Sequence, residues 1–87
     1  LQDTAFLMQQ LEWRERLADL KDDADPERAI KDFRSEIRHD HQSLMQRLTD
    51  ALTAGEDLAA ADCVRKLKFV DKLLEELERF EDSLFES

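Results

Sequence analysis

The chain contains a single glycine, Gly55, and a single proline, Pro26, among its 87 residues. Both residue types interrupt regular secondary structure, so a chain with one of each has long uninterrupted segments. Charged residues make up 40% of the sequence and apolar residues 41%, and tyrosine is absent. This composition is typical of amphipathic helices and not of strands joined by turns. We therefore predict an all-α fold, and the length allows one domain with one modest core.

Capping residues predict where the first two helices begin. The first helix is expected over about residues 4–20, because Asp3 or Thr4 can accept a hydrogen bond from a free amide of the first turn. A short polar break follows. The sequence Asp-Pro-Glu at 25–27 then predicts the start of a second helix over about 26–54, since Asp caps, Pro suits the first helical position and Glu favours the positive helix end.

A tight turn is predicted between the second helix and a third. Gly55 can take the left-handed conformation that ends a helix, and Asp57 can cap the next one over about 58–85. Apolar residues recur at three- and four-residue steps in both segments, among them Leu44, Leu48, Leu52, Leu58, Val64 and Leu67. Two long helices joined by so short a turn lie antiparallel. A three-helix up-down bundle is the simplest arrangement that buries all three apolar faces.

The charge balance restricts the partners and the compartment. Twenty-two acidic and thirteen basic residues give a formal net charge of −9, which repels nucleic acids and anionic membranes. No apolar run approaches the roughly 20 residues that span a bilayer.

Cys63 is the single cysteine and cannot form an internal disulfide, so a cytoplasmic protein is expected. The chain begins at Leu1 and not at Met, which suggests a segment of a longer protein.

The first predicted helix carries two apolar stripes. At roughly 100° per residue, one stripe forms the natural core face, and it consists of Phe6, Trp13, Leu17 and Leu20. The other stripe is interleaved with carboxylates; its members are Leu7, Met8 and Leu11, beside Glu12, Glu15 and Asp19. Either the helix is wedged between the other two and buries a wide arc, or the second stripe is an exposed patch that binds a partner.

The third helix has a comparable irregularity at Phe69. Leu67 and Val70 fall on one face with Cys63, whereas Phe69 is expected to point roughly the opposite way. The ring could be covered by neighbouring lysine and arginine stems, or it could be exposed for binding. Leu73 and Phe80 also leave the narrow core sector, and both are expected in the core because the third helix contacts both others.

The residues that could perform chemistry are few. His39 and His41 lie about 200° apart on a helix and cannot share a metal ion, so no metal site is expected. His41 is expected to be a satisfied core residue, and Cys63 an inert core thiol. No glycine-rich phosphate loop or nucleophile elbow is present. We expect no catalytic residues, no cofactor and no enzyme activity.

Two stretches, Asp3–Glu12 and Ala59–Leu73, resemble the C-terminal domain of HscB, the J-protein co-chaperone of bacterial iron–sulfur cluster assembly. The resemblance covers the whole chain, although residues 31–56 match only in character. It implies a three-helix domain that binds the cluster scaffold IscU. In that family a separate J domain with a His-Pro-Asp motif stimulates the DnaK-like ATPase HscA. This chain contains no His-Pro-Asp, so ATPase stimulation is not expected of these residues.

The resemblance also implies a binding surface. Carried over by motif, its residues are Leu7, Met8, Leu11, Glu12, Glu15, Asp19 and Phe69. All seven are residues that the helical wheel leaves outside the core. The predicted protein is a monomeric binding module for an IscU-type scaffold, which it helps to deliver to an HscA-type chaperone through a J domain absent from this chain. The alternative is a homo-oligomerisation domain in which the second stripe of the first helix pairs with itself.

Overall fold

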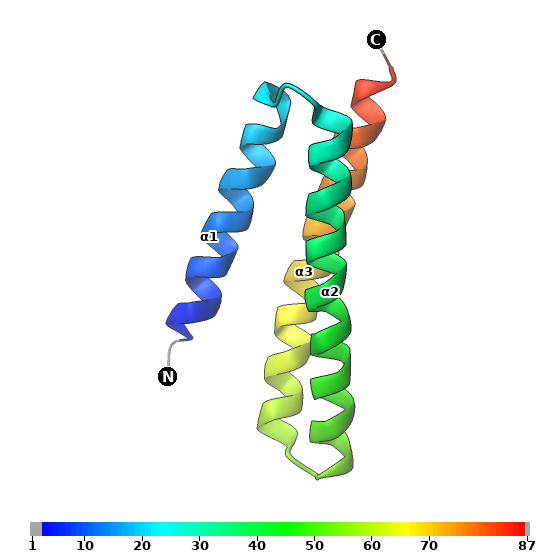
Figure 1. Cartoon of the computed structure of the whole chain (residues 1–87). Coiled ribbons are helices and arrows are strands. Elements are labelled where there is room, and N and C mark those ends of the chain that lie inside the picture. The colour runs from blue at the N-terminus through cyan, green and yellow to red at the C-terminus, as the bar shows by residue number, and fades with distance from the viewer. Residues whose placement is uncertain (1–2, 87) are drawn as a thin grey trace.

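A computed structural model describes residues 3–86, and it contains helices and no strands within that range. The elements are α1 (Thr4–Asp19), the short 3₁₀ helix η1 (Leu20–Asp22), α2 (Pro26–Thr53) and α3 (Asp57–Leu84). Figure 1 shows α2 and α3 side by side as an antiparallel hairpin, with α1 crossing one side of it. The predicted all-α bundle is confirmed, and the ends of the helices differ from the predicted ends by one residue at most.

The first two helices begin as the capping residues predict. Asp3 caps α1, and its carboxylate accepts a hydrogen bond from the Phe6 amide at 3.0 Å. Asp25 caps α2 and accepts from the Arg28 amide at 3.3 Å, with Pro26 in the first turn. These bonds satisfy amides that have no partner within the helix.

The α2–α3 turn depends on Gly55. Its φ of 72° is left-handed, the amide of Glu56 donates to the Ala51 carbonyl at 2.9 Å, and the Gly55 amide donates to the Leu52 carbonyl at 3.2 Å. This pattern is a Schellman motif, which closes a helix and reverses the chain. The predicted cap at Asp57 is wrong: Glu56 is the N-cap residue and makes no side-chain capping bond. The turn is so tight that Asp57 already lies in the first helical turn, where its carboxylate favours the positive helix end.

The core lies where α1 covers the hairpin. Its fully buried side chains come from all three helices and are Trp13, Ile30, Phe33, Ile37, Val70, Leu73 and Leu77. Leu73 is buried and Phe80 partly buried against this core, as expected. Ion pairs join each pair of helices around it, namely Arg14–Glu76, Arg16–Glu36 and Arg34–Glu81.

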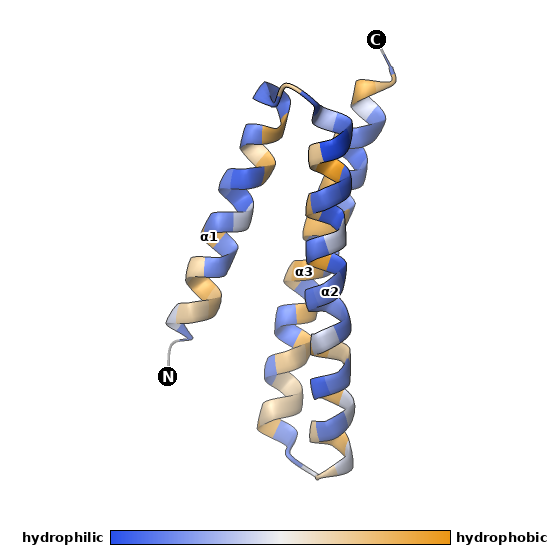
Figure 2. Ribbon diagram, in the orientation of Figure 1, coloured by the Kyte–Doolittle hydropathy of each residue, from blue (hydrophilic) through white to orange (hydrophobic). Residues whose placement is uncertain are grey.

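The end of the hairpin near Gly55 extends beyond α1. The first helix has 16 residues, whereas α2 and α3 have 28 each, so α1 leaves this end uncovered (Figure 1). Small buried residues, Ala51, Ala60 and Cys63, let the two helices pack here without a third. The first turns of α3 carry apolar colours in Figure 2. The apolar positions Leu52, Leu58 and Val64 are exposed, because no helix lies over them.

Candidate protein-binding surface on helix α1

The second apolar stripe of α1 faces outward. Leu7 is 52% exposed, Met8 64% and Leu11 63%, whereas Trp13 on the opposite side of the helix is 1% exposed. The alternative in which α1 buries a wide arc therefore does not hold for these three residues. Together with the neighbouring carboxylates they form what we name the α1 outer surface: Leu7, Met8, Leu11, Glu12, Glu15 and Asp19.

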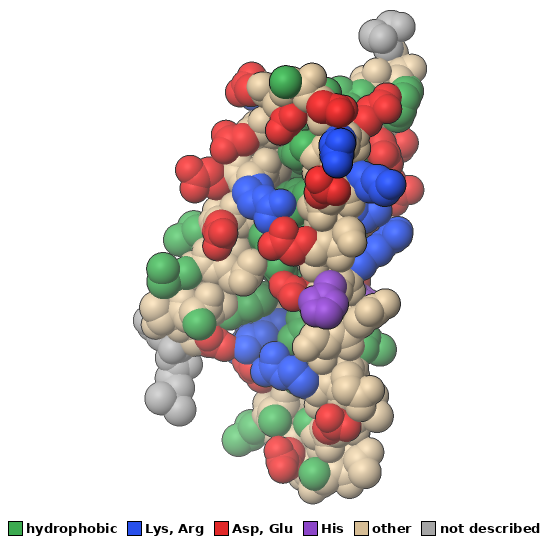
Figure 3. Space-filling view, viewed as in Figure 1, with side chains coloured by type: hydrophobic (Ala, Val, Ile, Leu, Met, Phe, Trp, Pro, Cys, Tyr) green, Lys and Arg blue, Asp and Glu red, His purple; other side chains and the backbone are tan. Residues whose placement is uncertain are grey.

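The charge on the α1 outer surface is negative because the basic residues of α1 are engaged elsewhere. Arg14 pairs with Glu76 of α3, and Arg16 pairs with Glu36 of α2. The carboxylates of Glu12, Glu15 and Asp19 are exposed, and none of them forms an ion pair within residues 3–86. Figure 3 shows hydrophobic side chains along the outer edge of α1 and acidic ones beyond them, toward the end of the helix.

The sequence pattern predicted that Phe69 points away from the core, and this prediction is wrong. The side chain lies partly buried against the core. Its ring packs edge-on against Phe6, with centroids 5.8 Å apart and planes at 84°, and parallel to Trp13 at 6.2 Å and 5°. The Arg14 guanidinium carbon lies 5.4 Å from the ring centroid. The ring is thus covered by α1. The cation that lies over the ring is the Arg14 guanidinium of α1 and not a lysine of α3.

Arg14 connects Phe69 to the α1 outer surface. It follows Leu7 by seven residues and Leu11 by three, so it shares the edge of the helix that these leucines occupy. Phe69 therefore borders the α1 outer surface along the seam between α1 and α3. The structure brings six of the seven predicted binding residues onto one exposed face of α1 and places Phe69 at its boundary, with a role in packing that the sequence did not reveal.

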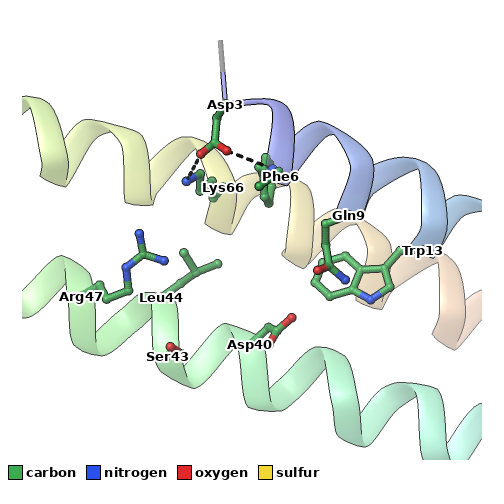
Figure 4. A pocket seen from close by; sticks show the side chains of 10 residues that line it. Asp3, Phe6, Gln9, Trp13, Asp40, Ser43, Leu44, Arg47 and Lys66 are labelled. Carbon is green, nitrogen blue, oxygen red and sulfur yellow. Dashed lines mark hydrogen bonds and ion pairs between the residues drawn. The ribbon is translucent and has the colours of Figure 1, made fainter. Parts of the chain in front are cut away.

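A partly buried ion pair lies at the start of α1. The side chain of Lys66 in α3 is 9% exposed, and its Nζ lies 2.6 Å from Asp3 Oδ2 and 2.9 Å from Asp62 Oδ2. The same Nζ sits 5.3 Å from the centroid of the Phe6 ring. Figure 4 shows Asp3 bridging Lys66 and the Phe6 amide. Sequence reasoning found Asp3 as a cap but missed its pairing with Lys66.

The ion pair changes the acidity of both partners. The hydrogen bond from Lys66, together with that from the Phe6 amide, lowers the pKa of Asp3 below 3.8. The hydrogen bond to Asp3 raises the pKa of Lys66 above 10.5, against the opposing effect of burial. Both groups are therefore charged at neutral pH.

A cleft of about 310 Å³ opens beside this ion pair, between α1 and α2. Its lining from α1 includes Phe6, Gln9 and Trp13, and its lining from α2 consists of Asp40, Ser43, Leu44 and Arg47 (Figure 4). The Trp13 Nε1 is buried without a hydrogen-bond partner in the described residues. The cleft shows that α1 is packed less closely to α2 at its N-terminal half.

The remaining candidate residues take structural positions. His41 is partly buried and its Nε2 lies 3.0 Å from Asp71 Oδ1, while His39 is exposed. Cys63 is buried in the hairpin. Within residues 3–86, no three His, Cys, Asp or Glu side chains are grouped to hold a metal ion. In the same part of the chain no helix combines the length and the apolar character that crossing a membrane requires.

Comparison with known proteins identifies the family. The model of the HscB C-terminal oligomerisation domain matches residues 2–78. The chain belongs to the HscB family. A co-chaperone protein HscB homolog of Aeromonas hydrophila is 87% identical over 100% of this chain and 51% of its own length. A homolog of Shewanella baltica is 48% identical over 99% of this chain and 51% of its own length.

The fold of this HscB-family chain also matches a solved structure. The chaperone HscB from Vibrio cholerae superimposes with a TM-score of 0.90 at 43% identity, over 97% of this chain and 52% of that one. The resemblance inferred from Asp3–Glu12 and Ala59–Leu73 is thus confirmed at the level of family and fold. The chain spans about half the length of the HscB proteins that it matches.

Proposed function

We propose that this chain is the part of an HscB co-chaperone that binds an IscU-type scaffold protein, and that the α1 outer surface makes the contact. Delivery of the scaffold to an HscA-type ATPase chaperone would use a J domain outside these residues. The action is binding and not catalysis, it needs no cofactor, and it takes place in the cytoplasm.

The exposed apolar stripe is the observation that supports this proposal best. Leu7, Met8 and Leu11 are each more than half exposed on one face of a helix whose opposite face carries the buried Trp13 and packs on the hairpin. Burying apolar side chains in the core stabilises the fold, whereas a contiguous exposed group of them has no such effect. Such a group commonly marks a surface that contacts another protein.

The charges around the stripe indicate the chemistry of the partner. Glu12, Glu15 and Asp19 are exposed and lack ion pairs in the described chain, and the whole chain has a net charge of −9. A partner with an apolar patch edged by lysine or arginine would complement this surface. The apolar residues would supply most of the affinity, and the carboxylates would chiefly set the rate of association and the choice of partner.

The experiment compares two leucines with nearly equal exposure. Leu11 is 63% exposed on α1 and Leu52 is 61% exposed near the end of the hairpin. Leu11→Ala should weaken binding to an IscU-type scaffold by about 1 to 4 kcal/mol in titration calorimetry. Leu52→Ala removes the same atoms from a distant part of the surface and should bind as the wild type does. Equal affinities for Leu11→Ala and wild type would refute the proposal.

A second candidate function is self-association, because the matching family model describes an oligomerisation domain. In that case the stripes of two copies would pair around a two-fold axis. The carboxylates beside each stripe would then face those of the other copy, and their repulsion argues against this arrangement. Sedimentation at low micromolar concentration separates the two: a dimer that Leu11→Ala dissociates would support self-association.

A further inference from the structure

The start of α1 is held to α3 by one residue with three roles. The Asp3 carboxylate accepts from the Phe6 amide at 3.0 Å, its other oxygen lies 2.6 Å from Lys66 Nζ, and its carbonyl accepts from the Leu7 amide at 3.1 Å. The residue that fixes the first turn of α1 is therefore also bonded to α3. Met8 follows directly after this turn.

Lys66 is itself fixed in position. Its side chain is 9% exposed, and Asp62, one turn earlier in α3, holds its Nζ at 2.9 Å. A buried cation between two carboxylates has few alternative positions. Lys66 therefore holds Asp3 at a fixed place relative to α3. At an exposed site such a pair contributes little, but burial of one partner strengthens the hydrogen bond.

Apart from this ion pair, the first turn of α1 is held to α3 by the Phe6 ring, which packs edge-on against Phe69. The cleft lined by Phe6, Gln9 and Trp13 separates this end of α1 from α2, and the ion pairs of Arg14 and Arg16 lie nearer the opposite end of the helix. Helix ends open locally when few contacts hold them. A first turn that frays would leave Leu7 and Met8 without a fixed orientation, and a partner would then have to order them at a cost in affinity.

We infer that Lys66 and Asp3 are positioning residues for partner binding: they order the first turns of α1 so that Leu7 and Met8 are presented in one orientation, without touching the partner themselves. This inference rests on the proposed binding role of the α1 outer surface. It assigns part of the affinity to a residue of α3 that is buried beneath that surface.

Amide hydrogen exchange tests the ordering without any partner. Lys66→Met keeps the apolar stem and removes the charge, so the amides of residues 7–9 should exchange about tenfold faster, while those of the buried core of α2 and α3 should not change. Asp3→Asn retains a capping oxygen and should act in the same direction. Lys68→Met makes the same change at an exposed lysine of the same helix and should leave residues 7–9 as in the wild type.

Titration with an IscU-type scaffold then tests the consequence. Lys66→Met should bind about three- to tenfold more weakly than wild type and Lys68→Met should not. Leu7→Ala should weaken binding less in the Lys66→Met background than in the wild type, because Leu7 is then already poorly presented. Unchanged exchange at residues 7–9, unchanged affinity of Lys66→Met, or additive effects with Leu7→Ala would each overturn the inference. A wild-type chain that fails to bind the scaffold would refute the proposed function instead, and the exchange data would still decide whether the ion pair orders α1.

Discussion

Truncation of Phe69 to alanine tests whether this ring belongs to the fold. The ring is partly buried between α1 and α3, parallel to Trp13 and edge-on to Phe6, with the Arg14 guanidinium above it. Replacing a buried phenylalanine with alanine costs about 3 to 5 kcal/mol. Each aromatic pair adds about 0.5 to 1.5 kcal/mol beyond the area that it buries. Because Phe69 keeps some exposure, we expect a loss of about 2 to 4 kcal/mol.

This loss is large for so small a domain. At about 0.05 to 0.15 kcal/mol per residue, the whole chain is stable by about 4 to 13 kcal/mol. In a domain of this size a change of about 1 kcal/mol moves the melting temperature by about 4 to 8 °C. Phe69→Ala should therefore melt about 8 to 30 °C below the wild type. Phe69→Leu keeps an apolar side chain and loses the ring contacts, so its melting temperature should be intermediate.

Thermal unfolding followed by circular dichroism measures the melting temperature of Phe69→Ala, with Leu11→Ala as the comparison. Leu11 is 63% exposed, and truncation at such a site changes stability by about 0.5 kcal/mol or less. If Phe69→Ala melts together with Leu11→Ala and the wild type, the stacked ring contributes nothing to the fold and the packing argument fails. If it melts early, its binding must be measured on the folded fraction before Phe69 is assigned any direct contact with a partner.

Three other measurements test separate parts of the structure. Replacing Glu12 and Glu15 with Gln should slow association with the scaffold and flatten its salt dependence more than it changes dissociation; equal salt slopes would count against steering by these carboxylates. Gly55→Ala should lower stability by about 1 kcal/mol in denaturant unfolding, because the left-handed φ of 72° strains an alanine although nothing crowds its Cβ within 4 Å; an unchanged midpoint would contradict this. The pKa of Asp3 is lowered by its bond to Lys66, so the stability it contributes is present above its unfolded value of 3.8 and is lost as the pH falls through the folded value. The difference in melting temperature between wild type and Asp3→Asn should accordingly shrink between about pH 5 and pH 2, and a constant difference would show that the charge is not responsible.

Local features of this chain could be predicted from the sequence because their causes lie within a few residues. Asp25 caps α2 through an amide three residues away, and the left-handed turn at Gly55 favours glycine, which has no Cβ to strain this conformation. The second apolar stripe of α1 could be recognised as well, since Leu7 and Leu11 stand on the side opposite to Trp13. Helical periodicity alone allowed this stripe to be either buried in a wide arc or exposed, and the structure shows it exposed.

The tertiary structure decided what depends on where α1 lies over the hairpin. Phe69 is outside the core sector of α3 taken alone, but α1 covers that side and makes the ring an internal contact. Leu58 is on an apolar face by spacing, yet it is exposed in the first turn of α3, in the part of the hairpin that extends beyond α1. The pairing of Lys66 with Asp3 joins residues 63 positions apart, and no local pattern specifies such a distance. Helix periodicity fixes which residues share a face, whereas the length and the crossing position of α1 determine which of those faces meet another helix and which remain open to a partner.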